Sequence, residues 1–215
     1  INSANTNEGS ITFAPDGKTI VFAKGNSGRR KGADDVDLYI SRYRRGGWSK
    51  PELMRINDKK AWDSTPSFSN DGRTLFFSSN RKGSIGGTDI YAATKNRRGR
   101  FSNVRNVGNR INTPGNDMFP YQGLDGALYF ASNGHPGLGG LDILVAKRVE
   151  GKMTVENLGA PLNSSADDFG LFLYTLDKGF FTSNREGGLG DDDIYTFINN
   201  DPDLKVVNYY LIGTT

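Results

Sequence analysis

The chain of 215 residues contains an internal repeat, and this repeat restricts the possible folds more than any other feature. Four segments align on a shared pattern, and they begin at Ile1, Ile56, Ile111 and Leu162. Their starts are therefore 55, 55 and 51 residues apart. A second signature, an Asp followed by an aliphatic residue, begins at Asp37, Asp89, Asp142 and Asp193, with steps of 52, 53 and 51. Two landmarks that keep one period near 50 residues are typical of propeller blades and similar arrays.

Each repeat has the sequence pattern of four β-strands. An Asp-Gly pair follows the first strand of three repeats, as hairpins favour, and the fourth repeat has "LDKG", so its turn should differ. The second strand is almost continuously apolar, which is expected where both faces of a sheet are packed. The third strand starts at the Asp of the second signature, and the fourth begins near Trp48, Phe101 and Met153. The sequence thus predicts an all-β fold, a β-propeller of four-stranded antiparallel blades.

The combination of "FSNDGRTLFFSSNR" and "GGTDIY" resembles the TolB-type (WD-like) β-propeller repeat. Such repeats occur in Bacteroidetes OmpA-family, peptidoglycan-associated cell-envelope proteins, among them proteins related to type IX secretion. The resemblance covers residues 1 to about 198 and recurs in register in all four repeats. It implies a periplasmic, outer-membrane-associated protein that binds partner proteins around a channel mouth.

The repeats divide the chain into a propeller region, residues 1–199, and a short tail. The repeats span residues 1–55, 56–110, 111–161 and 162–199. Residues 200–215 are expected to form a closing strand, supplied by Val206 to Ile212, or a linker into a following domain. The blade count stays open at this stage, since the ring closes either with a strand from the tail or with a fifth blade.

Charge is distributed unevenly along the chain. Residues 1–110 carry 21 Lys and Arg against 10 Asp and Glu, and residues 111–215 carry 6 against 14, which gives net charges of +11 and −8. We expect opposite sides of the molecule to present opposite fields, although scattered solvated residues would give the same count. No cysteine is present, so disulfides and thiolate metal sites are excluded.

Acidic residues precede the first strand of every repeat. If the first strands line a central channel, these carboxylates form an acidic ring near one mouth, which would attract a cation or a basic peptide. The alternative is that each carboxylate caps a turn or pairs with an adjacent blade. The predicted partner-binding residues are Glu8, Asp63, Asp117 and Asp168.

A basic patch is the second predicted interaction surface. It would suit an acidic protein surface, an anionic lipid or a glycan. Aromatic residues fall at strand positions and are expected in the core, so nucleic acid is not an expected partner. The patch comprises Arg29, Arg30, Lys31, Arg97, Arg98 and Arg100.

Glycine-rich loops such as "RKGSIGGTD" lead into every third strand. We expect the glycines to permit positive φ and the Asp to accept hydrogen bonds from the amides of its own loop. A calcium loop is the alternative for "GDDD" at 190–193 and "ADDVD" at 33–37, although neither has the EF-hand spacing. No metal and no cofactor is therefore expected.

Catalytic motifs are missing from the sequence. His135 is the only histidine and lies in a "SNGHPG" segment that predicts an exposed turn, and there is no Gly-x-Ser-x-Gly motif. We therefore expect no enzyme but a protein-protein interaction scaffold in the bacterial cell envelope, part of a larger peptidoglycan-tethered assembly such as a secretion apparatus. Its partners would be other cell-envelope proteins, with peptidoglycan or glycan reached through a domain outside this sequence. The alternative is a glycan-binding or glycan-hydrolysing propeller that uses the channel-mouth carboxylates.

Overall fold

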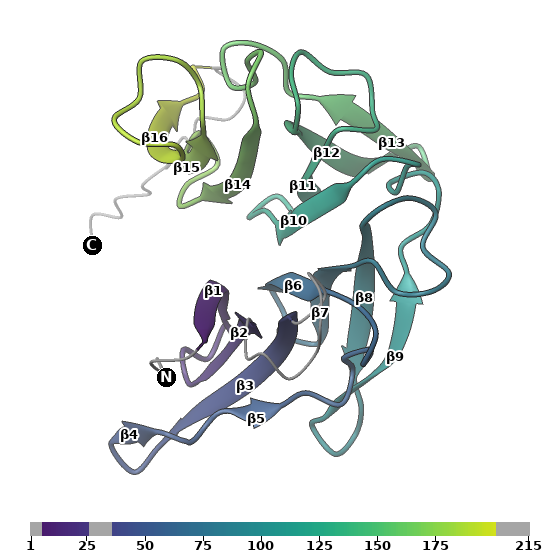
Figure 1. The fold of residues 1–215 in the computed structure, drawn as a ribbon, viewed down its shortest axis with the longest axis vertical. Coiled ribbons are helices and arrows are strands. Elements are labelled where there is room, and N and C mark those ends of the chain that lie inside the picture. Colours follow the sequence, from purple (N-terminus) through teal and green to yellow (C-terminus); the bar gives the residue numbers. More distant parts are fainter. Residues whose placement is uncertain (1–5, 26–35, 201–215) are drawn as a thin grey trace, which may run out of the picture.

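The computed structural model describes residues 6–25 and 36–200, and in this part of the chain it contains strands and no helix (Figure 1). The strands form four separate antiparallel sheets. In chain order they are β1 (Asn7–Phe13), β2 (Thr19–Gly25), β3 (Val36–Arg44), β4 (Gly47–Trp48), β5 (Glu52–Leu53), β6 (Asp63–Phe68), β7 (Thr74–Ser79), β8 (Asp89–Lys95), β9 (Phe101–Asn106), β10 (Asp117–Gln122), β11 (Leu128–Ser132), β12 (Asp142–Val149), β13 (Lys152–Asn157), β14 (Asp168–Leu173), β15 (Lys178–Ser183) and β16 (Asp193–Ile198).

Each sheet is one blade of a four-bladed β-propeller, as the repeats predict. Blades 1 to 4 are β1–β5, β6–β9, β10–β13 and β14–β16. Figure 1 shows the first strand of every blade near the centre and the later strands towards the rim. It also shows an opening between blade 1 and blade 4. The segment expected to supply the fourth strand of blade 4, Val206 to Ile212, lies outside the described residues.

The Asp-Gly turns form as expected in the first three blades. The glycine has a positive φ in each, +63° at Gly17, +65° at Gly72 and +81° at Gly126. The Asp carboxylate accepts a hydrogen bond from the amide two residues further on, for example from Arg73 to Asp71 at 2.9 Å. Blade 4 has a different turn, in which the Thr175 hydroxyl donates to Asp177 at 2.8 Å.

The hydrophobic core consists of the interfaces between successive blades. We call the face that a blade turns to the following blade its front face, and the opposite face its rear face. The front-face residue Leu38 packs in one cluster with Phe77 of blade 2. Ile90 and Phe130 join blades 2 and 3, and Ile143 and Phe181 join blades 3 and 4. Three apolar interfaces therefore hold four blades in an arc.

The Asn at each repeat boundary explains why this position recurs. Its side chain forms hydrogen bonds with both the amide and the carbonyl of one residue in the preceding blade, the residue that follows the third-strand Asp. Asn112 accepts from the amide of Ile90 and donates to its carbonyl, both at 2.9 Å. Asn163 does the same to Ile143, and Asn57 to Leu38. The side-chain amide thus pairs a backbone amide and a backbone carbonyl that would otherwise need a partner from a neighbouring strand.

Candidate functional site: the central channel

The three aspartates that begin the inner strands hold the loops before them. Asp63, Asp117 and Asp168 are fully buried. One carboxylate oxygen of each accepts a hydrogen bond from a loop amide, at 2.7 Å for Asp63 and at 2.6 Å for the other two. In blade 1, Glu8 lies 2.8 Å from Lys24. This geometry accounts for the acids as loop anchors, and their role in partner binding stays a prediction.

An arginine completes this arrangement in blades 2 and 4. Arg81 donates from Nη2 to Oδ1 of Asp63 at 2.7 Å and from Nε to the Ser79 hydroxyl at 2.8 Å. Its guanidinium lies over the rings of Phe77 and Tyr91, 5.0 Å from each centroid. Arg185 repeats these contacts, with 2.6 Å to Asp168. The recurrence of "SNR" after the second strand was the available sequence signal for this clamp.

Blade 3 lacks the arginine, and Gly134 and His135 stand at this place. The half-buried His135, which the sequence had suggested would be exposed, lies with Nε2 2.8 Å from the carbonyl of Ile111. No cation reaches Asp117, whose Oδ1 is buried without a hydrogen-bond partner in the described structure. Burial raises the pKa of Asp117, and the hydrogen bonds that it accepts from the Thr113 amide and hydroxyl only partly offset this effect.

The aspartates that begin the third strands bind their own loops, as predicted. Asp89 accepts from the amides of Ile85 at 2.7 Å and Gly86 at 3.1 Å. Asp142 and Asp193 accept from the two corresponding amides of their loops. Among the described residues, no group of three or more His, Asp or Glu side chains could hold a metal ion.

The paired glycines of these loops serve a purpose that differs from the predicted one. Gly86 and Gly139 are not among the positive-φ residues. A Cβ at Gly86 would collide with the carbonyl oxygens of Thr113 and Gly115, and one at Gly139 with those of the corresponding loop of blade 4. The paired glycines are therefore required for close approach between blades, whereas the first glycine of the loop has a positive φ as predicted, 96° at Gly83 and 94° at Gly187.

The four inner strands enclose a cavity of about 660 Å³ on the central axis. Within residues 6–25 and 36–200, its lining contains no Asp, Glu, Lys, Arg or His side chain. The lining residues are Ser10, Ile11, Thr12, Phe13, Pro15, Thr65, Pro66, Ser67, Phe68, Ser69, Asn70, Phe119, Pro120, Tyr121, Gln122, Leu124, Gly170, Leu171, Phe172 and Leu173. Asp63, Asp117 and Asp168 are absent from this wall, since they lie at the other end of their strands.

A β-bulge at one equivalent position of every inner strand shapes this wall. The residues with positive φ are Ser10 at 38°, Thr65 at 45°, Phe119 at 52° and Gly170 at 65°. The strand register shifts at each of these positions. A left-handed non-glycine residue costs on the order of 1–3 kcal/mol, yet three blades keep one here. Nothing in the repeat pattern had indicated these bulges, because serine, threonine and phenylalanine do not mark positive φ.

Aromatic side chains make the cavity apolar. The rings of Phe119 and Phe169 lie 4.6 Å apart, from neighbouring blades. Phe13 of blade 1 and Phe172 of blade 4 line the cavity and are 57% and 50% exposed. Burial raises the pKa of Tyr121, whose hydroxyl donates to the carbonyl of Leu173 at 3.0 Å. The channel therefore offers apolar surface and uncharged hydrogen-bonding groups.

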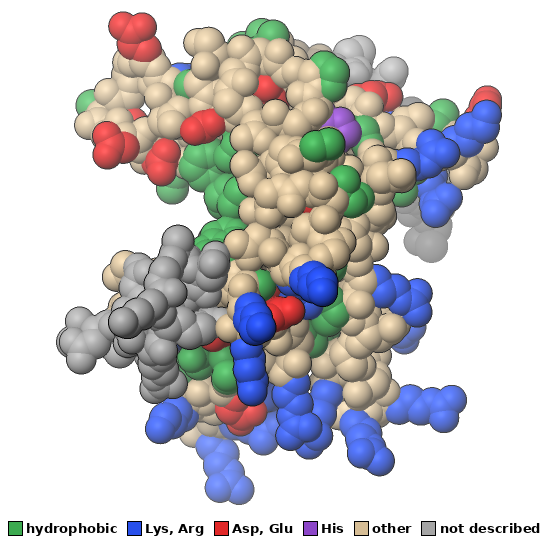
Figure 2. Space-filling model, turned by 45° about the vertical axis from the view of Figure 1, so that its right-hand side comes forward, with side chains coloured by type: hydrophobic (Ala, Val, Ile, Leu, Met, Phe, Trp, Pro, Cys, Tyr) green, Lys and Arg blue, Asp and Glu red, His purple; other side chains and the backbone are tan. Residues whose placement is uncertain are grey.

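Charged side chains lie away from the channel. Figure 2 shows Lys and Arg gathered over the lower part of the molecule, where blades 1 and 2 lie, and Asp and Glu over the upper left. Arg97, Arg98 and Arg100 are exposed in the turn between β8 and β9. The other predicted members of the basic patch, Arg29, Arg30 and Lys31, lie outside the described residues.

No family model matches the sequence, and no curated protein matches it. Among solved structures, TolB from Acinetobacter baumannii is similar, with a TM-score of 0.57 and 17% identity over 91% of this chain and 42% of that chain. A putative TolB from Agrobacterium tumefaciens has a TM-score of 0.52 and 17% identity over 89% of this chain and 77% of that chain. A luciferin-regenerating enzyme has a TM-score of 0.58 and 13% identity over 92% of this chain and 62% of that chain.

These similarities define a TolB-like β-propeller fold. At such identities they concern the fold alone, and the similar structures include an enzyme as well as TolB proteins. The chain spans 42% and 62% of the first two structures.

Proposed function

We propose that the chain is a non-catalytic protein-interaction scaffold whose central channel binds an uncharged, apolar segment of a partner protein. The observation that carries this proposal is the chemistry of the cavity wall, which among the described residues has no carboxylate, imidazole, amine or guanidinium. General acid–base catalysis needs a titratable group within hydrogen-bond reach of the substrate, and the phenol of Tyr121, which lines the cavity, instead donates to the carbonyl of Leu173 at 3.0 Å. An apolar wall with a few hydroxyl and amide groups is suited to binding instead.

The size and the exposed side chains of the channel suit an extended peptide. Its volume of about 660 Å³ lies within the range of roughly 300–1,000 Å³ that is usual for ligand sites. Phe13, Phe172 and Ile11 are each at least half exposed there. Exposed aromatic residues in a concave surface are the side chains that most often dominate binding energy.

The alternative function, a propeller that binds or hydrolyses glycans through channel-mouth carboxylates, requires acids that a sugar can reach. Asp63, Asp117 and Asp168 have no exposed surface, and loop amides occupy one oxygen of each. The side chain of Glu8 is 14% exposed and lies 2.8 Å from Lys24. We therefore favour the scaffold. Enzyme-like turnover of peptidoglycan or other glycans by the purified chain would contradict it.

We place this scaffold in the periplasm, associated with the outer membrane, in contact with other cell-envelope proteins. The support is the resemblance of the repeats to those of OmpA-family, peptidoglycan-associated proteins and of type IX secretion-related proteins. In the described part of the chain, no helix is long and apolar enough to cross a membrane. Fractionation tests this placement: osmotic shock should release the protein or leave it with outer-membrane fragments, and recovery with cytosolic enzymes contradicts the placement.

Calorimetric titration tests the channel directly. The probe is a ten-residue peptide of alternating valine and serine with one central proline, compared with the same peptide carrying aspartate for serine. We expect only the uncharged peptide to bind, and Phe172→Ser to weaken binding at least about tenfold. Val149→Ser is the matched control, because Val149 is 45% exposed on blade 3 outside the cavity.

Salt separates the channel from the basic patch. Binding in an uncharged channel should be nearly the same in 50 mM and 500 mM NaCl, whereas binding to exposed arginines should weaken strongly. Preference for the aspartate peptide, or an affinity that falls with salt, would place the interaction on Arg97, Arg98 and Arg100 and contradict the channel proposal.

A further inference from the structure

The front face of blade 4 is exposed, whereas the corresponding faces of the other blades are buried. The residue after the third-strand Asp gives the clearest comparison. It is 0% exposed as Leu38 and Ile90, 1% as Ile143 and 77% as Ile194. Ile198 and Phe180 of the same face are 61% and 39% exposed. A repeat position that lies within an interface in three blades therefore has no neighbour in the fourth.

The loop before β16 shows the same difference in its backbone. In blades 2 and 3 the carbonyls of Thr88 and Leu141 accept hydrogen bonds from the amides of Asp117 at 2.7 Å and Asp168 at 2.6 Å, the first residues of the next inner strands. The corresponding carbonyl in blade 4, that of Asp192, has no such partner within the described residues.

The glycine of this loop also faces open space. Gly86 and Gly139 lie against the backbone of the following blade, but at the equivalent Gly190 a Cβ would meet only Asp193 Oδ1, at 3.9 Å. The next residue is Asp191, where blades 2 and 3 have a second glycine. Leu189 of this loop is fully exposed. Ile194, the Asp192 carbonyl and Gly190 thus form the same three-part docking surface that blades 2 and 3 use.

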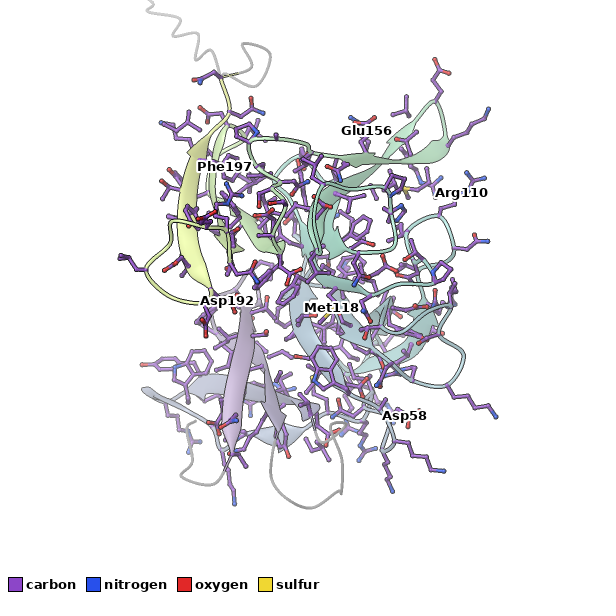
Figure 3. The ribbon with its side chains drawn as sticks, turned by 45° about the horizontal axis from the view of Figure 1, so that its top comes forward. Asp58, Arg110, Met118, Glu156, Asp192 and Phe197 are labelled. Carbon is purple, nitrogen blue, oxygen red and sulfur yellow. The ribbon has the colours of Figure 1, made fainter. Side chains whose placement is uncertain are left out.

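Blade 1 does not cover this surface. Figure 1 shows blades 1 and 4 on the two sides of the opening in the arc. On the blade 1 side, Ile11, Phe13 and Leu53 are 54%, 57% and 56% exposed. Asp192, directly before β16, and Phe197, within β16, lie at the margin of the molecule (Figure 3).

We propose that the front face of blade 4 docks a further blade of the same repeat, carried outside residues 1–215. Continuity with the three existing interfaces defines its chemistry. Its rear face carries an aromatic pair such as Phe77 and Tyr91, which stack at 6.0 Å in blade 2. Its inner strand begins with an acidic residue whose amide donates to the carbonyl of Asp192. Such a blade would bury Ile194 and close the channel beside Phe172.

A five-repeat protein tests this proposal. A second copy of residues 56–110, which carries Phe77 and Tyr91 and begins its inner strand with Asp63, is joined ahead of Ile1, so that the copy precedes blade 1 at a natural repeat boundary. The melting temperature should rise above that of the 215-residue chain. Ile194→Glu should lower the melting temperature of the five-repeat protein by about 5 °C or more, because a buried charge is introduced, and leave that of the 215-residue chain unchanged.

Val149→Glu, at an exposed site of blade 3, is the matched control and should be silent in both proteins. The proposal is overturned if the added repeat does not raise the melting temperature, or if Ile194→Glu has the same effect with and without it. It is also overturned if the 215-residue chain sediments as a dimer that Ile194→Glu dissociates, since the occupant would then be a second copy.

Discussion

The guanidinium of Arg81 lies 2.7 Å from Oδ1 of Asp63, and the two side chains are only 12% and 0% exposed. The same guanidinium stacks over two aromatic rings and reaches the repeat boundary through the carbonyl of Ile56 at 3.2 Å. One side chain therefore ties together the first, second and third strands of blade 2 and the segment that precedes it.

Arg81→Leu should destabilise the protein by about 3–5 kcal/mol, because it leaves the buried carboxylate of Asp63 without its cation. Urea unfolding at pH 7, followed by tryptophan fluorescence, measures this. Arg73→Leu is the control, since Arg73 is an exposed turn residue, and it should change the free energy of unfolding by no more than about 0.5 kcal/mol. Equal effects of the two substitutions would show that the ion pair contributes nothing.

Asp117→Asn should stabilise the folded protein at pH 7 and not destabilise it, because Asp117 is buried without an arginine beside its carboxylate. Its pKa is raised in the folded protein, so the folded state binds the proton more tightly than the unfolded state. The resulting stabilisation is complete below the unfolded pKa of about 3.9 and is lost as pH rises through the folded pKa. The asparagine variant lacks this dependence.

The free energy of unfolding of Asp117→Asn should therefore increase relative to that of the wild type from pH 4 to pH 7. Urea unfolding of both proteins at these two pH values measures the difference. Asp63→Asn is the matched comparison, because it separates Arg81 from its carboxylate and should cost several kcal/mol at pH 7. A stability difference between Asp117→Asn and wild type that does not vary with pH would contradict the assignment.

Local and periodic features of this fold could be predicted from the sequence. The 51- to 55-residue period defines the blades, the Asp-Gly pairs define three hairpins, and Asp89 and its equivalents bind the loop amides as their spacing suggested. Each of these depends on residues a few positions apart, and repetition separates the signal from chance.

Features that depend on contacts between blades could not be predicted in the same way. Gly86 looks like any loop glycine until the backbone at Thr113 is placed against it. The bulge at Thr65 is likewise hidden, because threonine is not a residue type that marks positive φ. The burial of Asp63 and its position at the start of its strand, away from the cavity, likewise depend on packing, and the role of the predicted acids in partner binding stays a prediction.

Gly86 and Gly190 occupy the same position in their repeats, yet replacing each by alanine should change the free energy of unfolding by very different amounts. At Gly86 the methyl group meets the backbone of blade 3, which cannot move aside as a side chain can, and we expect a loss of about 2–3 kcal/mol. At Gly190 the only contact is an ordinary one with Asp193, and the expected change is within about 0.5 kcal/mol. Thermal unfolding of both variants beside wild type gives the comparison, and a costly Gly190→Ala would mean that this loop is already covered.

Tyr121→Phe should weaken the contact between blades 3 and 4 at the channel wall. The Tyr121 hydroxyl donates to the carbonyl of Leu173 at 3.0 Å and accepts from its amide at 3.4 Å, so removal leaves two backbone groups unpaired. We expect a loss of about 1–2 kcal/mol and faster amide exchange in β14. Tyr174→Phe, at a residue 48% exposed, is the control and should leave exchange in β14 unchanged.

The pH dependence gives a second, independent test of this contact. Burial raises the pKa of Tyr121 above its usual value of about 10, so the protonated phenol stabilises the folded state below that value, and this stabilisation is lost as pH rises through the folded pKa. Between pH 8 and pH 11 the wild type should therefore lose more stability than Tyr121→Phe. If the two proteins lose stability in parallel, the Tyr121 hydroxyl does not join the blades, and the apolar cluster around Ile143 together with the hydrogen bond from Asp168 to the carbonyl of Leu141 holds blade 4 in place.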